Sequence, residues 1–289
     1  MSKLTLMVGA PGSGKTTYAH QLPPCRYVNQ DSQGRQHLDY FNSFIANNEN
    51  IVVDRMGFNL SQRDRYLRPA KEKGYETEIV VLHESYKTCF ERVMARKDHP
   101  TIKNEESARS ALNTFFTKYE RVQDSEADKV TRIWPSGEKP KAVYSDLDGT
   151  LALVEHRRHF VQKEGKKDWN GFFKEMVNDP VNQPVMDTLK KFSNTHRIIY
   201  CSGRPDNWRK ETERWLMDKD APNCFCLENY LFMRSRNDSR QDNIVKEILL
   251  DFEILTRYSI DFCLDDRDQV VKMLRSRGLI VFQVADGDF

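Results

Sequence analysis

The sequence predicts an α/β protein made of two doubly wound parallel-sheet domains. Its 289 residues exceed the usual size of one domain, about 100–200 residues. Short apolar runs alternate with helical patterns twice, before and after a turn-rich joint at residues 134–140 (WPSGEKP). Strands that alternate with helices form right-handed βαβ units on a parallel sheet. We therefore expect one domain over residues 1–136 and a second over residues 137–289.

The first domain opens with a continuous apolar run, LTLMV at residues 4–8, which is typical of a buried parallel strand. A glycine-rich turn follows this strand, and a helix is expected from about Lys15. The remaining pattern predicts strands at residues 26–29, 51–54 and 78–83, and helices at residues 38–47, 61–74, 85–96 and 107–122.

The second domain repeats this alternation after Pro140. The pattern predicts strands at residues 142–145, 197–201, 230–233, 260–264 and 279–284, and helices at residues 184–194, 206–218 and 242–255, with one more before the last strand. Residues 155–184 are polar and aromatic and follow neither period. We expect a small cap or loop insertion there.

Composition restricts the function classes. A net charge of +2 gives no whole-chain signal for nucleic acid, so a polyanion would need a local basic patch. The six cysteines are scattered without a CxxC pair, which predicts reduced thiols, a cytoplasmic setting and no zinc site. No apolar run approaches the ~20 residues that span a bilayer, and the amino terminus does not resemble a signal peptide.

A phosphate-binding motif follows the first strand. The run GAPGSGKT satisfies G-x-x-x-x-G-K-[ST] between a strand and a helix, where glycines turn backbone amides toward phosphate. Lys15 is expected to reach the β- and γ-phosphates of ATP, and Thr16 to hold Mg²⁺. The candidate ATP-binding residues of this loop are Gly9, Pro11, Gly12, Ser13, Gly14, Lys15, Thr16 and Thr17.

Two acids and two arginines extend this site. Asp31 follows the second strand, where a general base would meet an acceptor hydroxyl, and Asp54 ends the third, where it would support Mg²⁺ or the acceptor. Arg92 and Arg96 lie four residues apart, hence on one helix face, and with residues 97–100 predict a lid over the γ-phosphate. Strand-end turns and solvated arginines are the alternative explanations.

Four polar motifs of the second domain follow strands or lie on a helix that can reach the same sheet edge. They are Asp146-x-Asp148-Gly149-Thr150, Ser202-Gly203-Arg204, Lys246 and Asp265-Asp266. Such a set can supply a carboxylate that attacks phosphorus and a second acid that protonates the leaving alcohol and then activates water. A hydroxyl and a lysine would neutralise the phosphoryl oxygens, and further acids would hold Mg²⁺.

This second pattern resembles the haloacid-dehalogenase-type phosphatase superfamily, with Asp146 in the nucleophile position and Asp148 in the acid/base position. Both patterns in this order resemble the bacteriophage 5′-polynucleotide kinase/3′-phosphatase family over nearly the whole chain. The matching segments are GAPGSGKTT, KPKAVYSDLDGTLA, CSGR, IVKEI, LDDRDQVV and VADGDF.

The resemblance implies a P-loop kinase domain that transfers the γ-phosphate of ATP to 5′-OH ends of DNA or RNA. It implies a second domain that removes 3′-phosphate or 2′,3′-cyclic phosphate ends. Catalytic roles fall on Lys15, Asp31, Arg96, Asp146, Asp148 and Lys246. Lid roles fall on Arg92 and Arg96. Substrate phosphate contacts fall on Ser202, Gly203, Arg204, Arg234 and Arg267. Mg²⁺ in the two domains would be held by Thr16, Asp146, Asp148, Asp265 and Asp266.

The sequence departs from this family at the acceptor side. The family often has an arginine three residues after the base aspartate, and Gly34 occupies that position here, so Arg35 or Arg26 is expected to contact the acceptor's 3′-phosphate. Residues 52–67 (VVDRMGFNLSQRDRYL) are more similar to kinases fused to RNA-repair ligases than to the phage enzyme. The preference for DNA or RNA as the substrate is therefore left open. Family members are commonly homotetramers, and their products suit a ligase.

Two other functions fit the same motifs. One is a small-molecule P-loop kinase fused to a haloacid-dehalogenase-type nucleotidase, for which a free nucleoside or sugar would be a better acceptor than an oligonucleotide. The other is a nucleic-acid-binding module without catalysis, which the presence of Lys15, Asp146 and Asp148 disfavours.

Overall fold

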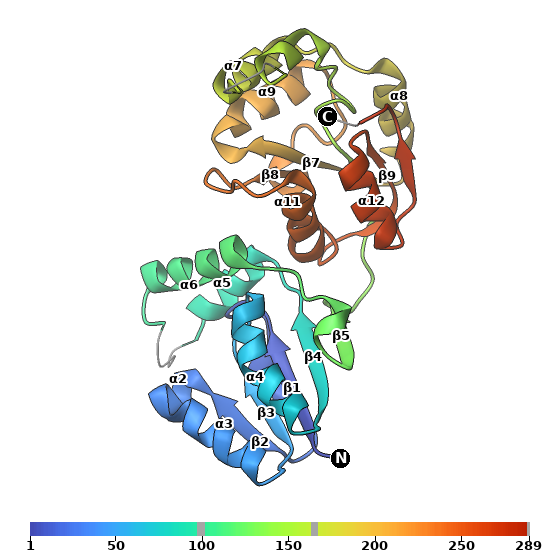
Figure 1. Cartoon of the computed structure of the whole chain (residues 1–289). Helices are drawn as coiled ribbons and strands as arrows, with labels where there is room; N and C mark the ends of the chain where they lie inside the picture. The colour runs from blue at the N-terminus through green and yellow to red at the C-terminus, as the bar shows by residue number, and fades with distance from the viewer. Residues whose placement is uncertain (97–101, 163–166, 288–289) are drawn as a thin grey trace. The chain divides into compact units, whose positions relative to one another are not determined.

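A computed structural model describes residues 1–96, 102–162 and 167–287 of the chain. The chain forms two compact units, Met1–Ser136 and Gly137–Phe289. Each unit contains a five-stranded sheet in which all neighbouring strands are parallel (Figure 1). The predicted fold class, two parallel-sheet α/β domains, is confirmed.

The sheet of the first unit has the strand order β2-β3-β1-β4-β5. Its strands are β1 (Lys3–Val8), β2 (Arg26–Asn29), β3 (Ile51–Asp54), β4 (Glu76–Leu82) and β5 (Lys129–Ile133). Its helices are α1 (Lys15–Ala19), α2 (Gln30–Gln33), α3 (His37–Ala46), α4 (Leu60–Glu72), α5 (Tyr86–Met94) and α6 (Glu105–Lys118). Helix α4 packs across β1 and β4, in front of the sheet in Figure 1.

The sequence pattern does not predict β5. Its residues KVTRI alternate in polarity and are half-buried or exposed, so their strand structure depends on pairing with β4 at the sheet edge. The helix expected at residues 107–122 begins at Glu105 instead, because the Asn104 side chain accepts a hydrogen bond from the Ser107 amide at 2.8 Å and caps it.

The sheet of the second unit has the strand order β10-β9-β6-β7-β8. Its strands are β6 (Lys141–Ser145), β7 (Arg197–Pro205), β8 (Leu231–Arg234), β9 (Ser259–Asp265) and β10 (Val281–Gln283). Its helices are α7 (Trp169–Lys174), α8 (Gln183–Phe192), α9 (Arg209–Asp218), α10 (Leu227–Tyr230), α11 (Asp242–Ile248) and α12 (Asp268–Ser276). A wider helical turn, Leu249–Ile254, continues α11.

Two apolar cores lie on opposite faces of this second sheet. Val143 packs in one of them with buried residues of α8 and α9. Its neighbours Ala142 and Tyr144 pack in the other, with buried residues of α12 and of the turn after α11. Successive side chains of a strand point to opposite faces, so β6 must be covered on both sides. The central strand is thereby held rigidly where it ends at Asp146.

The insertion between β6 and α8 contains short helical turns at Glu155–Phe160 and Glu175–Asn178, with α7 between them. These turns come from the stretch in which the sequence shows no clear period. Among the described residues, no helix combines the length and the apolar character needed to cross a membrane.

Candidate active sites

The phosphate loop of the first unit lies between β1 and α1, as expected. Its glycine at position 12 has a φ of 85°, and a Cβ atom there would lie 2.4 Å from the Cys89 carbonyl oxygen, so only glycine fits. Lys15 is buried, and its Nζ donates to the Ala10 carbonyl oxygen at 2.8 Å. Burial lowers the pKa of Lys15. The loop forms a cradle that fits phosphate.

The acids of the first unit meet this loop. The Thr16 hydroxyl donates to Asp54 Oδ2 at 2.7 Å, and the Tyr27 hydroxyl donates to the same oxygen. Asp31 lies at the start of α2, which the Asn29 side chain caps, and is exposed. Thr16, Asp31 and Asp54 line one cavity of about 130 Å³ with Lys15. Hydroxyl and carboxylate oxygens beside a phosphate loop are the ligands that Mg²⁺ prefers.

The two predicted lid arginines have different positions. Helix α5 ends at Met94, so Arg96 lies beyond the helix, and the expectation that both arginines share one helix face is wrong. Arg96 lines the cavity of the phosphate loop. Arg92 instead donates to Glu84 Oε2 at 3.0 Å and to the Gly12 carbonyl oxygen at 3.4 Å. The rest of the expected lid, residues 97–100, lies outside the described residues.

The cavity at the phosphate loop also contains an arginine that sequence reasoning missed. Arg55 lines the cavity, whereas Arg26 and Arg35 are not among its lining residues. Arg55 Nη1 lies 3.0 Å from His37 Nε2 and 3.0 Å from the Tyr66 hydroxyl. The sequence signal that could have indicated Arg55 is its position directly after Asp54, the acid that ends β3.

In the second unit, the strand ends bring three carboxylates together. Oxygen atoms of Asp146, Asp265 and Asp266 all lie within 4.8 Å of one another. Lys246 Nζ donates to Asp146 Oδ1 at 2.7 Å and to Asp265 Oδ2 at 3.0 Å, and the Thr150 hydroxyl donates to Asp266 Oδ1 at 3.1 Å. The sequence prediction of a shared sheet edge therefore matches the geometry.

The charges of this cluster are not balanced by the described residues. Burial, together with repulsion from Asp265, raises the pKa of Asp146 to about 7 although Lys246 opposes the shift. Burial and neighbouring acids raise the pKa of Asp265 and of Asp266 to about 6 each. Asp266 Oδ2 is buried without a hydrogen-bond partner among the described residues. Three buried carboxylates with an orphaned oxygen fit a divalent cation such as Mg²⁺.

A close approach fixes the glycine of the DxDGT motif. Gly149 has a φ of 91°, and a Cβ atom there would lie 2.1 Å from Asp266 Oδ2. Any side chain at this position would displace the carboxylate that completes the cluster.

Asp148, the fourth metal ligand predicted for this unit, has a different environment from the other three. The Asp148 carboxylate does not belong to this cluster, because two buried arginines bind it: Arg204 Nη2 and Arg157 Nη2 each donate to Oδ1 at 2.5 Å. Burial alone would raise the pKa of Asp148, but the two guanidinium groups outweigh it and hold the pKa well below its usual range. Arg157 and Arg204 both also bind the buried carboxylate of Asp179.

The remaining predicted residues surround these carboxylates. Ser202 is fully buried and its hydroxyl accepts from the Arg204 amide at 3.2 Å. Arg234 donates to the Gly203 carbonyl oxygen at 2.8 Å and to Asp242 Oδ1 at 3.1 Å, and Arg267 donates to Asp242 Oδ2 at 3.3 Å. Asp242 thus orients Arg234 and Arg267, two of the three arginines that were expected to contact phosphate.

Sequence reasoning missed three buried residues of this site: Arg157, Asp179 and Asp242. Asp242 precedes Lys246 by four residues on α11 and lies 3.6 Å from its Nζ, so helical spacing could have indicated it. Arg157 and Asp179 come from the insertion without a clear period, where no spacing argument applies.

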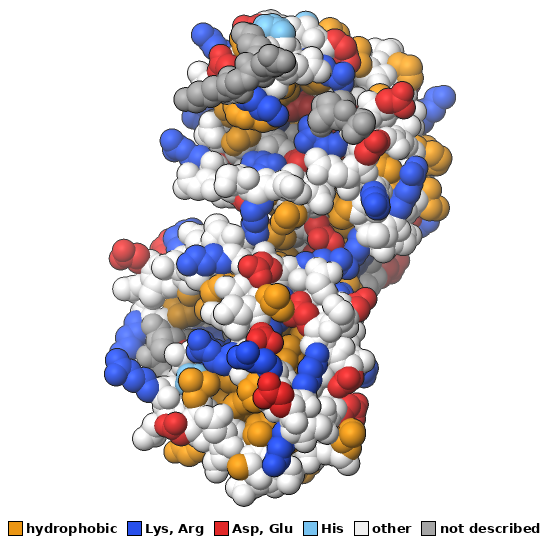
Figure 2. Space-filling model, viewed as in Figure 1, with side chains coloured by type: hydrophobic (Ala, Val, Ile, Leu, Met, Phe, Trp, Pro, Cys, Tyr) orange, Lys and Arg blue, Asp and Glu red, His pale blue; other side chains and the backbone are white. Residues whose placement is uncertain are grey.

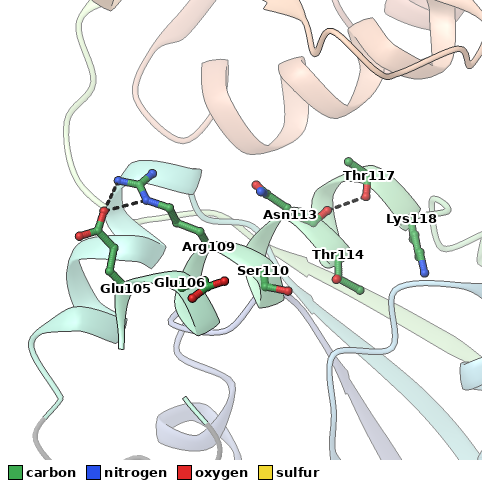
Figure 3. Close-up of a pocket in the computed structure, with 8 residues that line it drawn as sticks. All are labelled: Glu105, Glu106, Arg109, Ser110, Asn113, Thr114, Thr117 and Lys118. Atoms are coloured by element: carbon green, nitrogen blue, oxygen red, sulfur yellow. Dashed lines mark hydrogen bonds and ion pairs between the residues drawn. The ribbon is translucent and has the colours of Figure 1, made fainter. Parts of the chain in front are cut away.

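A shallow hollow also runs along α6, and its lining differs from that of both sites (Figure 3). Its described lining is one helix face of polar side chains, which pair locally: Arg109 donates to Glu105 four residues earlier, and the Thr117 hydroxyl donates to the Asn113 carbonyl oxygen. Such pairs are ordinary on a solvated helix. We assign no chemistry to this hollow.

The folds and sites of the two units define the class of protein: a P-loop kinase-type domain joined to a haloacid-dehalogenase-type phosphatase domain. The chain belongs to the family described as polynucleotide kinase PNKP phosphatase domain, whose model matches residues 140–289. The predicted resemblance to polynucleotide kinase/phosphatases is therefore confirmed.

The individual relatives share only modest sequence identity with this chain. The chain is 24% identical over 306 residues to a protein of Autographa californica nuclear polyhedrosis virus that is provisionally named a bifunctional polynucleotide kinase/RNA ligase. That alignment covers 94% of this chain but only 40% of the length of the viral relative.

Solved structures give weak overall superpositions. A chain in a Pnkp1/Rnl/Hen1 complex is 28% identical, with 100% of this chain and 98% of that chain covered, at a TM-score of 0.43. A class C acid phosphatase from Bacillus anthracis with tungstate bound is 17% identical, with 51% of this chain and 68% of that chain covered, at a TM-score of 0.39.

Proposed function

We propose that this protein heals nucleic-acid ends. Its first domain would transfer the γ-phosphate of ATP to a 5′-OH end of DNA or RNA. Its second would hydrolyse a 3′-phosphate end, or a 2′,3′-cyclic phosphate end, to a 3′-OH. Opposite reactions on one chain are useful only if they act on different ends, and the products are the two ends that a ligase joins.

The cluster of Asp146, Lys246 and Asp265 carries this proposal. A carboxylate oxygen that lies 2.7 Å from a buried ammonium group is fixed in one orientation at the end of a rigid strand, as nucleophilic attack requires. Lys246 stays charged, because the surrounding acids outweigh its burial and raise its pKa well above the usual value. It can therefore neutralise a phosphoryl oxygen.

The phosphatase reaction follows from these positions. An Asp146 oxygen attacks phosphorus, the bond from phosphorus to O3′ breaks, and Asp148 gives its proton to O3′. Water then attacks the aspartyl-phosphate, Asp148 takes the proton of that water, and phosphate leaves. Bound Mg²⁺, held by Asp146, Asp265 and Asp266, would supply charge neutralisation for the phosphoryl oxygens.

Asp148 must be protonated for the first step, although its two arginines keep it ionised in the free protein. The negative charge of a substrate phosphate placed at Asp146 would disfavour the ionised form of Asp148 in the same cavity and so raise its pKa. Substrate binding would thus prepare the general acid.

The kinase reaction would use the cavity at the phosphate loop. We propose that Asp31 accepts the proton of the 5′-OH while Lys15 and Arg96 neutralise the transferred phosphoryl group. Arg55, in the same cavity, is the candidate for contact with the acceptor's 3′-phosphate, since Arg35 and Arg26 are not among its lining residues.

Family membership supports a polynucleotide substrate. Lys and Arg side chains are interspersed with Asp and Glu on the face of each unit that Figure 2 shows. The viral relative's name includes an RNA ligase, which supports action together with a ligase. All six cysteines are free thiols, in keeping with a cytoplasmic protein. A homo-oligomer, a tetramer by family resemblance, is part of the same proposal.

The test is incubation of the full chain with ATP, Mg²⁺ and matched DNA and RNA oligonucleotides that carry a 5′-OH and a 3′-phosphate. We expect a gained 5′-phosphate and a lost 3′-phosphate, and the better acceptor identifies the natural polymer. Free nucleosides and sugars are tested in parallel. If they accept phosphate better than the oligonucleotides, the chain is a small-molecule kinase joined to a nucleotidase and the proposal fails.

A further inference from the structure

The insertion of the second unit contributes an aromatic wall to the phosphatase cavity. This cavity has a volume of about 670 Å³, within the usual range for ligand sites. Asp146 and Asp148 line it, and Trp169, Phe172 and Phe173 of α7 line it as well. The carboxylate chemistry described above gives these three rings no role.

The three rings form a supported platform. Phe172 and Phe173 are buried, whereas Trp169 is 49% exposed. The Trp169 ring stacks on that of Phe173, with 6.0 Å between centroids and 24° between planes, and meets Phe172 edge-on at 5.8 Å. A large exposed indole on a fixed aromatic base provides a flat surface at little cost in side-chain entropy.

The platform is joined to the catalytic carboxylates. The Arg157 guanidinium group lies 4.1 Å from the centroid of the Phe172 ring, and the same group binds Asp148. Arg157 and Phe172 are both buried, so the cation–π contact between them is largely protected from water. The distance between the aromatic wall and the acid/base residue is therefore fixed by packed groups.

Cations accompany the rings in the same cavity. Arg158 and Lys167 belong to the insertion, and Arg240 and Arg267 line other parts of the cavity. Lys167 Nζ lies 5.7 Å from the centroid of the Trp169 ring. Cations that neutralise a phosphate backbone, next to an aromatic face, are the combination that proteins use to bind single-stranded nucleic acid.

We infer that Trp169 stacks on the base of the 3′-terminal nucleotide of a single-stranded nucleic acid while its 3′-phosphate lies at Asp146. This inference rests on the proposed 3′-phosphatase function and adds the recognition element of its substrate. Because every base has a flat face, stacking accepts any base at the end. The insertion is thus a nucleobase-binding wall of the site.

The test is a double-mutant cycle in which the Trp169 side chain and the terminal base of the substrate are each removed, alone and together. It uses the full chain with Mg²⁺. Two single-stranded oligonucleotides with a 3′-phosphate are compared, one ending in an ordinary nucleotide and one in an abasic tetrahydrofuran residue. The proteins are the wild type, Trp169→Ala, Trp169→Phe and the control Phe225→Ala, an exposed aromatic of the same unit that does not line the cavity. The rate of phosphate release, expressed as kcat/KM, is measured for each pair.

We expect Trp169→Ala to lower kcat/KM about 5- to 150-fold for the base-bearing end. Trp169→Ala should release phosphate from the abasic end with the same kcat/KM as the wild type. This result would also show that the variant folds. Trp169→Phe should keep most of the activity, and Phe225→Ala all of it. Equal losses on both substrates, or no loss on either, would overturn the inference. Phosphate release from neither substrate by the wild type would instead overturn the proposed function.

Discussion

Arg157 Nη2 donates to Asp148 Oδ1 at 2.5 Å, and this partly buried ion pair lies beside a fully buried pair between Arg157 and Asp179. The arginine comes from the insertion, and the first acid follows the central strand of the sheet. The contact therefore couples the insertion to the proposed general acid, and the protonation of Asp148 depends on a residue outside the sheet.

Replacement of Arg157 tests this coupling. We expect Arg157→Lys to slow the turnover of substrates with a 3′-phosphate about 100-fold, because Asp148 loses a contact that orients it as the general acid. Lysine keeps the charge but not the paired donors, so it binds Asp148 and Asp179 less well. The pKa of Asp148 should rise, and the pH–rate profile should therefore shift toward higher pH. Kinase activity should be unchanged.

Arg214→Ala is the matched control, because Arg214 is an exposed arginine of α9 in the same unit. An Arg157→Lys protein that retains the wild-type pH profile would show that the ion pair is only structural. Thermal unfolding of both variants separates lost activity from lost stability.

The carboxylate cluster predicts a pH-dependent stability. Burial and the charge of Asp146 raise the folded-state pKa of Asp266 to about 6, above its ordinary value of 3.8. The protonated form therefore favours folding, and this contribution is lost as the pH rises through about 4 to 6. Without divalent cations, Asp266→Asn should raise the free energy of unfolding by about 2–3 kcal/mol near neutral pH.

Mg²⁺ and pH provide the controls for that measurement. The advantage of Asp266→Asn should shrink as the pH is lowered to about 5, where the wild-type carboxyl becomes protonated. Mg²⁺ should raise the unfolding midpoint of the wild type more than that of the variant. If Asp266→Asn is less stable than the wild type at neutral pH, the repulsion described here does not exist.

The phosphate-loop cavity predicts which arginine recognises the acceptor. Arg55→Ala should raise the KM for an oligonucleotide acceptor about tenfold or more, since a hydrogen bond to a charged group is lost. The KM for ATP should change little. Arg35→Ala, at a residue that does not line the cavity, is the comparison and should have the smaller effect. The reverse order would assign the acceptor contact to Arg35.

Much of this arrangement could be predicted from the sequence. Apolar strands followed by GAPGSGKT and DLDGT predict two parallel sheets with polar carboxyl edges, and the end of a further parallel strand places Asp265 at the same edge as Asp146. These predictions succeed because strand and helix periods are local properties and parallel topology brings strand ends together.

The parts that could not be predicted depend on tertiary packing. Arg157 and Asp179 lie in a segment without a regular period, and only the folded insertion brings them to Asp148. The edge strand β5 likewise depends on its pairing with β4. Spacing likewise could not show that two arginines bind the Asp148 carboxylate.

The most direct test of the central claim uses one oligonucleotide with a 5′-OH and a 3′-phosphate, and two variants of the full chain. Lys15→Ala should lose 5′ phosphorylation and keep 3′ dephosphorylation, because Lys15 and Asp146 belong to separate compact units. Asp146→Asn should lose 3′ dephosphorylation and keep 5′ phosphorylation. If each substitution abolishes both reactions, or if neither abolishes its own, the assignment of two opposite reactions to two sites is wrong.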